Sequence, residues 1–435
     1  MRRIIFSLFV IILPLFTATA LEPEVESRNK AEREEWFMDA GLGLFIHWSL
    51  DSQIGSVISH SMVGASEEYL NRYINELPQS FNPTKFDAEE WAILAKLAGF
   101  QYVMFTTKHH SGFCMFDTKT TPFNIMNTPY GDDVTADIVK AFRKHGIAVG
   151  FYYSPDDFYF LHQQGTPISR RRPGVAPHEN PDLLKYDQAQ LRELLTNYGP
   201  IDLLFLDGPV LGLTDLCWDL QPDTIITRGA MQTPEQHIPK QPIPGPWEAC
   251  LTMGTQWQYK PTNEEYKSGT LSIEILIETR AKGGNLLYNI GPKPNGEIPE
   301  EQEALMRELA LWNFVNEEAV FNIRPWVVTN EGDIWFTKKK DEDTVYAIVT
   351  KTPWKYGEKK TFSLKSVKAT DETVVSVLGQ NSEVLEYQPD VIPKTEWSQD
   401  EDGLHISAYR AQRLYNDKKW PNPVVLKITN AEAVE

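Results

Sequence analysis

Cysteine is scarce in this chain of 435 residues, which contains only Cys114, Cys217 and Cys250. The three lie far apart and show none of the short spacings typical of zinc ligands. Disulfide-stabilised scaffolds are built from more closely and regularly placed cysteines. The sequence therefore predicts buried free thiols, no disulfide framework and no metal site built on cysteine.

Long apolar runs are also missing, because the stretch from Ile4 to Phe16 is shorter than the roughly 20 residues that cross a bilayer. It follows Arg2-Arg3 and precedes Ala18-Thr19-Ala20, which is the basic, apolar and small-residue order of a secretory signal peptide. No cysteine follows the expected cleavage point after Ala20 to carry a lipid. We predict a signal peptide over residues 1–20, no membrane span, and export to the periplasm or the extracellular space.

Positive charge is in short supply, since 42 Lys and Arg residues face 60 Asp and Glu residues, for a formal net charge of -18. Loss of Arg2 and Arg3 with the signal peptide lowers this charge to -20. Proteins that bind nucleic acid neutralise phosphates with lysine and arginine. The charge therefore argues against a nucleic-acid partner and favours a neutral or weakly charged ligand.

No internal repeat and no low-complexity linker interrupts the chain. The two domains that we assign below should therefore pack rigidly against each other. Strand-like runs alternate with amphipathic helices from about residue 30 to 320, which is typical of a parallel sheet covered by helices. The number of such runs favours a (β/α)8-like barrel over an open sheet, and we assign residues 21–323 to it. Residues 324–435 contain short alternating runs separated by charged turns, which predict a smaller antiparallel β-sandwich domain.

One helix of the barrel domain is marked at both ends. Asp87 stands where an N-cap is expected, the apolar face includes Trp91 and Leu94, and Gly99 permits a left-handed exit. A strand follows directly from residue 101. This order predicts the helix-to-strand connection of a βα unit.

Polar side chains follow three of the predicted strands, at the point where each strand ends. Asp207 ends the run that begins at Ile201, His109 and His110 end the run from residue 101, and His47 ends the run from Gly41. A single case is what any apolar strand shows on meeting a polar loop. Several together predict a site, because parallel barrels carry their chemistry at the carboxyl ends of their strands.

A carboxylate at such a position suits glycoside hydrolysis, in which two carboxyl groups flank the bond that breaks. Asp207 is the first candidate. The second is Glu235, in a proline-rich loop from Pro234 to Pro246, or Glu248, which opens a strand and can instead hold loops by hydrogen bonds. The residues by themselves leave these two glutamates unranked.

Six motifs occur in an order that resembles the α-L-fucosidases of glycoside hydrolase family 29. The resemblance covers residues 35–298 and is carried by the following runs: Gly43-Leu-Phe-Ile-His-Trp, Lys108-His-His-Ser-Gly-Phe, Gly150-Phe-Tyr-Tyr-Ser, Leu206-Asp-Gly, Trp247-Glu and Gly284-Asn-Leu-Leu-Tyr-Asn-Ile-Gly-Pro. It implies a retaining exo-glycosidase that acts on terminal α-L-fucosyl linkages of glycans by double displacement, without cofactor or metal.

The resemblance also implies roles for single residues. Asp207 matches the nucleophile and Glu235 the acid/base, with Glu248 kept as the fallback acid/base. By the same matching, His47, His109, His110 and Tyr152 bind the sugar hydroxyls, Arg228 lies near the carboxylates, and Trp257 forms part of an apolar wall. Imidazole rings suit neighbouring hydroxyls because one ring both donates and accepts. For the His109-His110 pair a metal site is a weaker interpretation, because no third ligand stands at fixed spacing.

Departures from the family pattern collect around the expected substrate. Ser111 stands where the family has an aspartate, Ser49 and Asp51 replace a Gly and Tyr pattern, and residues 55–62 replace a Glu-Trp-Tyr-like group. Two alternatives therefore stay open beside fucoside hydrolysis. One is a glycosidase for a related sugar, such as an α-L-galactoside or a methylated fucoside, and the other is a non-catalytic carbohydrate-binding protein. The sequence leaves the linkage, the aglycone and the oligomeric state open.

Overall fold

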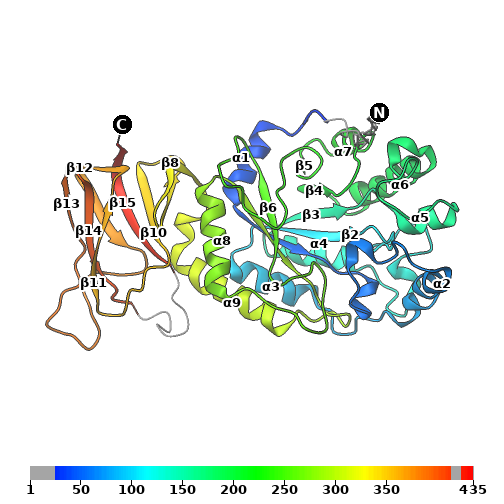
Figure 1. The fold of residues 1–435 in the computed structure, drawn as a ribbon, viewed down its shortest axis with the longest axis horizontal. Helices are drawn as coiled ribbons and strands as arrows, with labels where there is room; N and C mark the ends of the chain where they lie inside the picture. Colours follow the sequence, from blue (N-terminus) through cyan, green and yellow to red (C-terminus); the bar gives the residue numbers. More distant parts are fainter. Residues whose placement is uncertain (1–24, 413–422, 435) are drawn as a thin grey trace, which may run out of the picture.

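A computed structural model describes residues 25–412 and 423–434 of the chain. The predicted signal peptide lies outside these residues. A parallel α/β domain is followed by an antiparallel β domain, which lies against helices α8 and α9 (Figure 1). This arrangement confirms the predicted fold class.

Seven parallel strands form the sheet of the first domain. Their order is β5-β4-β3-β2-β1-β7-β6, so the sheet curves with β5 and β6 at its two edges. Each strand is buried along nearly its whole length, as expected where helices cover a parallel sheet. The strands are β1 (Leu42–Ile46), β2 (Tyr102–Lys108), β3 (Ala148–Tyr153), β4 (Leu203–Leu206), β5 (Ile225–Ile226), β6 (Glu248–Thr252) and β7 (Asn285–Ile290).

An irregular segment stands where the eighth strand of the predicted barrel was expected. The amide of Gln236 donates to the carbonyl of Cys250 (2.9 Å), and the amide of Cys250 donates to the carbonyl of Pro234 (3.0 Å), so residues 232–236 run beside β6. Proline has no N–H to give to a ladder. The predicted barrel-like parallel fold is therefore confirmed, but its sheet has seven regular strands instead of eight. Beside the edge strand β6, the place of the eighth strand is taken by a loop that carries Glu235.

Helices connect the strands and cover the sheet. The side chain of Asp87 accepts from the amides of Glu89 and Glu90, and Gly99 has the left-handed φ of +92°, so the predicted helix ends are confirmed. No helix of the described chain has the length and apolar character needed to span a membrane. The helices are α1 (Ala31–Ala40), α2 (Glu67–Asn75), α3 (Ala88–Ala98), α4 (Val134–Lys144), α5 (Phe158–Gln163), α6 (Pro181–Asn197), α7 (Thr214–Leu220), α8 (Gly269–Ala281) and α9 (Glu300–Asn316).

The second domain is a sandwich of two antiparallel sheets, with orders β12-β15-β10-β9-β8 and β11-β14-β13. Side chains of both sheets share one apolar core, among them Phe336, Leu364 and Ile406. Its first strand begins at Ile323, one residue before the predicted second domain. The strands are β8 (Ile323–Glu331), β9 (Ile334–Lys339), β10 (Thr344–Val349), β11 (Lys359–Leu364), β12 (Val367–Val377), β13 (Glu396–Asp400), β14 (Gly403–Tyr409) and β15 (Val424–Ala433).

The two domains are joined by apolar and ionic contacts. Tyr346, Ile348 and Val425 of the sandwich belong to the main core of the barrel domain. Lys340 of the sandwich lies 2.6 Å from Glu35 and 2.9 Å from Asp39 of α1. These contacts support the predicted rigid packing.

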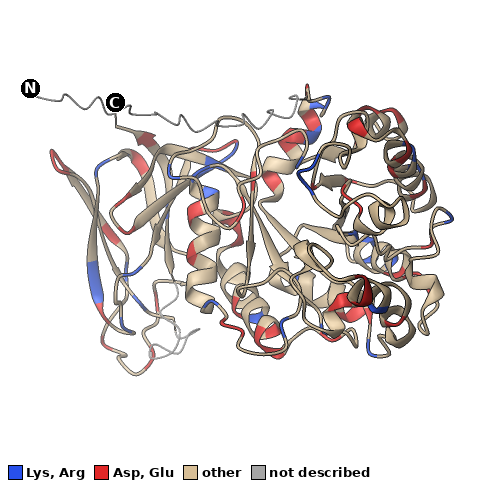
Figure 2. Cartoon of the chain, turned by 45° about the vertical axis from the view of Figure 1, so that its right-hand side comes forward, with Lys and Arg blue, Asp and Glu red and all other residues tan. Residues whose placement is uncertain are grey.

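The distribution of acidic residues and the state of the cysteines agree with the predictions from composition. Acidic residues recur along the outer helices and loops of both domains (Figure 2). Cys114, Cys217 and Cys250 are free and buried, as predicted.

Candidate active site

A cavity of about 130 Å³ lies where the carboxyl ends of the parallel strands meet. Wider surface grooves of about 540 and 650 Å³ lie along α3 and α9 and bring no pair of carboxylates onto one cation. The cavity is lined by Phe45, His47, Ser59, His109, Tyr152, Arg170, Phe205, Asp207, Arg228, Glu235, Cys250 and Trp257.

The carboxylate of Asp207 lies directly after β4 and is held at both oxygens. Oδ2 accepts from the hydroxyl of Tyr152 (2.8 Å) and Oδ1 accepts from Nη1 of Arg228 (2.9 Å). Gly208 follows with a φ of +154°, and a Cβ there would lie 3.2 Å from the carboxylate of Asp156. Glycine therefore lets the chain turn closely past Asp156 while Asp207 points into the cavity.

The surroundings of Asp207 keep this group ionised. Burial raises its pKa, but the proximity of His110 and the charges of Arg228 and Arg170 outweigh burial and hold the pKa well below its usual range. A carboxylate that stays ionised is a competent nucleophile across the ordinary pH range.

Glu235 reaches the same cavity from the irregular segment beside β6. Its Oε2 lies 3.0 Å from Nη1 of Arg228, the nitrogen that also contacts Asp207. The side chain of Glu235 is 44% exposed, whereas that of Asp207 is 18% exposed. One carboxylate is thus fixed inside the cavity and the other stands at its open side.

Glu248, the alternative second carboxylate, is placed elsewhere. It begins β6, is fully buried and does not line the cavity. Its Oε2 accepts from the hydroxyl of Tyr102 (2.8 Å), and burial raises its pKa to about 7. This carboxyl group forms a contact between strands inside the barrel.

Two neutral histidines present opposite hydrogen-bonding groups to the cavity. The amide nitrogen of Asn289 donates to the carbonyl of Trp257 (2.6 Å), so its oxygen accepts from Nδ1 of His47 (2.6 Å). Burial lowers the pKa of His47 to about 3, so the ring is neutral and its Nε2 is an acceptor. Nδ1 of His109 accepts from the amide of His110 (2.9 Å), and burial holds the pKa of His109 well below its usual value. Its Nε2 therefore carries the proton and donates.

Aromatic rings form the walls between these groups. Tyr152 stacks on His109 with ring centroids 5.0 Å apart, and Trp257 packs on His47 at 4.9 Å. The guanidinium of Arg228 lies over the ring of Phe205 at 4.7 Å. These ring contacts hold His109, His47 and Arg228 in fixed orientations.

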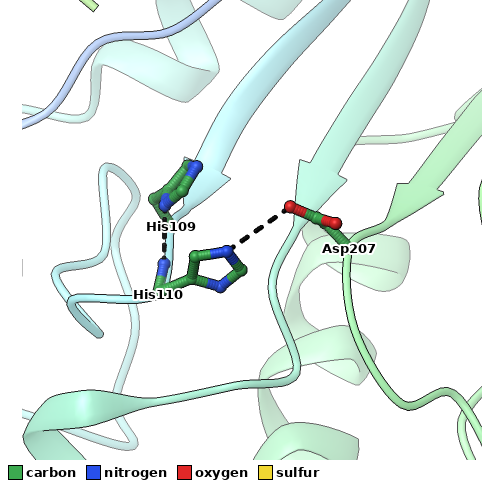
Figure 3. A group of neighbouring side chains, drawn as sticks. All are labelled: His109, His110 and Asp207. Atoms are coloured by element: carbon green, nitrogen blue, oxygen red, sulfur yellow. Dashed lines mark hydrogen bonds and ion pairs between the residues drawn. The ribbon is translucent and has the colours of Figure 1, made fainter. Parts of the chain in front are cut away.

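His110 lies behind Asp207 and does not line the cavity. Figure 3 shows its ring directed at Asp207, with Nε2 3.5 Å from Oδ2, while Nδ1 contacts the hydroxyl of Ser154 at 2.5 Å. One ligand atom from each of His109, His110 and Asp207 lies within 4.8 Å of the others. The donor set does not fit a metal ion, because both oxygens of Asp207 already accept, from Tyr152 and Arg228, and Nδ1 of His110 contacts Ser154.

Five residues of the cavity wall were not predicted as site residues from the sequence: the polar Arg170 and Ser59, and Phe45, Phe205 and Cys250. Arg170 comes from the loop after α5, and Ser59 comes from the 3₁₀ turn Ile58–His60, within the segment that departs from the family pattern. The run Arg170-Arg171-Arg172 in so acidic a chain was an available signal for the first. Ser49, Asp51 and Ser111 are buried and do not line the cavity.

Two carboxylates at the mouth of a parallel barrel, in a cavity of monosaccharide size, define the fold and site of a glycoside hydrolase. Because Oδ1 of Asp207 and Oε2 of Glu235 share one nitrogen as partner, they lie no more than about 6 Å apart, nearer the roughly 5–5.5 Å of retaining enzymes than the roughly 6.5–9.5 Å of inverting ones.

Comparison with known proteins supports the assignment to the glycoside hydrolases. A family model described as α-L-fucosidase matches residues 13–318. The plasma α-L-fucosidase of Rattus norvegicus is 27% identical over 411 residues, which cover 83% of this chain and 86% of that protein. The chain belongs to the α-L-fucosidase family, and the resemblance seen in the six motifs is confirmed.

Solved structures show the same architecture. α-L-Fucosidase isoenzyme 1 from Paenibacillus thiaminolyticus matches with a TM-score of 0.73 at 26% identity, over 93% of this chain and 99% of that one. A family 29 α-L-fucosidase of Bacteroides thetaiotaomicron, trapped as a covalent intermediate with 2-fluoro-fucosyl fluoride, matches with a TM-score of 0.71 at 22% identity. That likeness covers 97% of this chain and 100% of the other, and it supports the fold.

Proposed function

We propose that this protein hydrolyses terminal α-L-fucosyl linkages of glycans with retention of anomeric configuration. The observation that carries the proposal is the convergence of Asp207 and Glu235 on one nitrogen of Arg228. Membership of the α-L-fucosidase family indicates that the sugar is α-L-fucose.

In the first step, a carboxylate oxygen of Asp207 attacks the anomeric carbon while Glu235, as a carboxylic acid, gives its proton to the departing glycosidic oxygen. The carbon–oxygen bond to the aglycone breaks, and a fucosyl ester of Asp207 forms. In the second step, Glu235 as carboxylate takes a proton from water, whose oxygen attacks the same carbon and releases Asp207. Two inversions at one carbon give net retention.

The cavity walls suit the sugar that this reaction requires. Nε2 of His47 accepts a hydrogen bond and Nε2–H of His109 donates one, so the pair can hold neighbouring hydroxyl groups in a fixed orientation. The ring of Trp257 offers an apolar face to the C–H side of a deoxyhexose. Arg228, by contact with both carboxylates, fixes their separation.

The direct test is turnover of an aryl α-L-fucoside by wild type and by Asp207→Ala. We expect wild-type turnover with α-L-fucose as the first product in proton NMR, and no measurable turnover by the variant. Full activity of Asp207→Ala would refute the mechanism. Fucose binding without turnover by the wild type would establish a carbohydrate-binding protein instead.

A second candidate, a glycosidase for a related sugar, is favoured by Ser59. This small polar side chain lines the cavity from the segment that replaces a larger group in the family pattern. Parallel assays of aryl α-L-fucoside, aryl α-L-galactoside and a methylated fucoside decide between the two. A clear preference for the fucoside eliminates this candidate.

We also propose that the protein is exported to the periplasm or the extracellular space. The proposal is supported by the order of basic, apolar and small residues over positions 1–20. N-terminal sequencing of the mature protein should give Leu21 as the first residue. A mature chain that begins at Met1 would contradict it.

A further inference from the structure

A third buried carboxylate lies behind the catalytic pair and has no part in the reaction described above. Asp156 follows β3, and its side chain is only 3% exposed. Its Oδ2 accepts from Nε of Arg170 at 2.8 Å and lies 3.8 Å from Nδ1 of His110. The carboxylate therefore faces two groups that are cationic when protonated.

Both partners of Asp156 also lie against the nucleophile. Nη2 of Arg170 is 4.0 Å from Oδ1 of Asp207, and Nε2 of His110 is 3.5 Å from Oδ2 of Asp207. The arginine and the histidine thus each lie between the same two carboxylates, in the way that buried charges are arranged when each is compensated.

The hydrogen bonds around His110 fix where its protons are. The hydroxyl of Ser154 gives its single proton to the backbone carbonyl of Asp156 (2.9 Å), so it accepts from Nδ1 of His110 (2.5 Å). Nδ1 therefore carries a proton. A neutral ring would then turn the lone pair of Nε2 towards the carboxylate of Asp207, whereas an imidazolium turns an N–H towards it. The ring is fully buried, so water does not relieve the clash.

The charges that face His110 come from several elements. Asp207 follows β4, Asp156 follows β3, and Arg170 comes from the loop after α5. The guanidinium of Arg228 follows β5, and the neighbouring imidazoles of His47 and His109 are neutral. Two carboxylates therefore oppose the charge of His110, while the two guanidinium groups are each paired with one of those carboxylates.

We propose that Asp156 is a positioning residue for the nucleophile, which holds His110 as the imidazolium and anchors Arg170 at the cavity wall. Arg170, tied back through Nε to Asp156, stands with Nη2 4.0 Å from Oδ1 of Asp207. Asp207 then remains an ionised carboxylate with cations beside it. This inference rests on the proposed function only for the identity of the nucleophile.

The charge state of His110 can be measured directly in the wild-type protein. With ¹⁵N-labelled histidine, both ring nitrogens of His110 should show protonated shifts at pH 7, with assignment by comparison with His110→Gln. A neutral ring at pH 7 would overturn the proposal. This measurement does not depend on turnover of any sugar, so it stands even where the proposed function fails.

Asp156→Asn keeps the shape and removes the charge. Because the carboxylate that faces Nδ1 is lost, the ¹⁵N shifts of His110 at pH 7 should move towards those of a neutral ring in the variant. The alkaline limb of kcat/KM should move to lower pH, with kcat reduced more than KM is changed. Arg171→Gln, an exposed neighbour, is the matched control and should leave both unchanged.

Variants of Arg170, a partner of Asp156, distinguish a positioning role from a purely structural one. Arg170→Gln should lower kcat, and Arg170→Lys should restore part of the loss because it returns the charge. If Asp156→Asn leaves both the ¹⁵N shifts of His110 and the pH profile where they are in wild type, Asp156 does not act through these groups and the proposal fails.

Discussion

Glu235 and Glu248 differ in what surrounds each carboxyl group. The residue pattern left these two glutamates unranked, and the family resemblance placed Glu235 first. Glu235 stands at the open side of the cavity beside Arg228, where it can reach both a leaving oxygen and water. Glu248 is sealed in the barrel against Tyr102. Access to solvent and substrate, and not residue type, favours the first as the acid/base.

We predict that Glu235→Ala lowers kcat by about 100–10,000-fold on fucosides with poor leaving groups, which is the usual contribution of general acid–base catalysis. The loss should be smaller on an aryl fucoside with an activated leaving group, and azide should restore turnover and give a fucosyl azide. Steady-state kinetics on both substrates checks this prediction.

Glu248→Gln is the matched control, since it changes a buried carboxyl group outside the cavity. It should retain activity on both substrates. A large loss in Glu248→Gln together with little loss in Glu235→Ala would reverse the assignment.

At the scale of single elements, the end of β2 is tied to two helices by a buried ion network. Nζ of Lys108 lies 3.1 Å from Asp157, which caps α5, and 3.1 Å from Asp187 of α6. The hydroxyl of Tyr153 donates to Asp187 at 2.6 Å. Because Lys108 directly precedes His109 and His110, this network fixes the backbone from which both histidines project.

Lys108→Met should lower the free energy of unfolding by about 3–5 kcal/mol, because two buried carboxylates lose their cation. Denaturant unfolding measures this effect. Lys119→Met removes an exposed lysine instead and should change stability little. Equal stability of Lys108→Met and wild type would show that the network does not stabilise the fold.

The N-cap of α3 offers a second test at this scale. Asp87→Ala removes the side chain that accepts from two amides of the first turn, and this should cost about 1 kcal/mol of stability. Asp87→Asn keeps an acceptor and should recover most of the loss. Activity well below the unfolding transition should not change, since Asp87 contacts no residue of the cavity wall. Equal midpoints for all three proteins would contradict the prediction.

At the scale of the whole molecule, buried groups of two kinds give stability opposite dependences on pH. Burial raises the pKa of Asp51 from 3.8 to about 6, so between these values the unfolded chain loses a proton that the folded chain keeps. Its contribution to stability therefore falls as pH rises from about 4 to 6. Burial lowers the pKa of His47 from 6.5 to about 3, so the unfolded chain binds the extra proton there. The contribution of His47 rises with pH over about 3 to 6.5.

These signs predict opposite trends in two variants. Relative to wild type, the Tm of Asp51→Asn should rise as pH is raised from 4 to 6, and the Tm of His47→Asn should fall over the same range. Calorimetry at several pH values in one buffer series measures both. Parallel trends in the two variants would contradict the burial argument.

The sequence by itself determined the order of elements, the two-domain division and the strand-end positions of Asp207, His47 and His109, because apolar periodicity and turn residues act over a few neighbours. It also determined the family, through motifs whose residues stand close together in the chain.

Tertiary structure alone decided which side chains meet. The bridge of residues 232–236 to β6 brings Glu235 to Arg228, and the loop after α5 brings Arg170 to Asp156 and Asp207. Such contacts join segments tens of residues apart, and they depend on how loops of irregular shape pack over a barrel mouth. Local sequence patterns do not encode that packing. The burial of Glu248 against Tyr102, the direction of the His110 ring towards Asp207 and the contacts of Asp156 with Arg170 and His110 are therefore seen only in the folded chain.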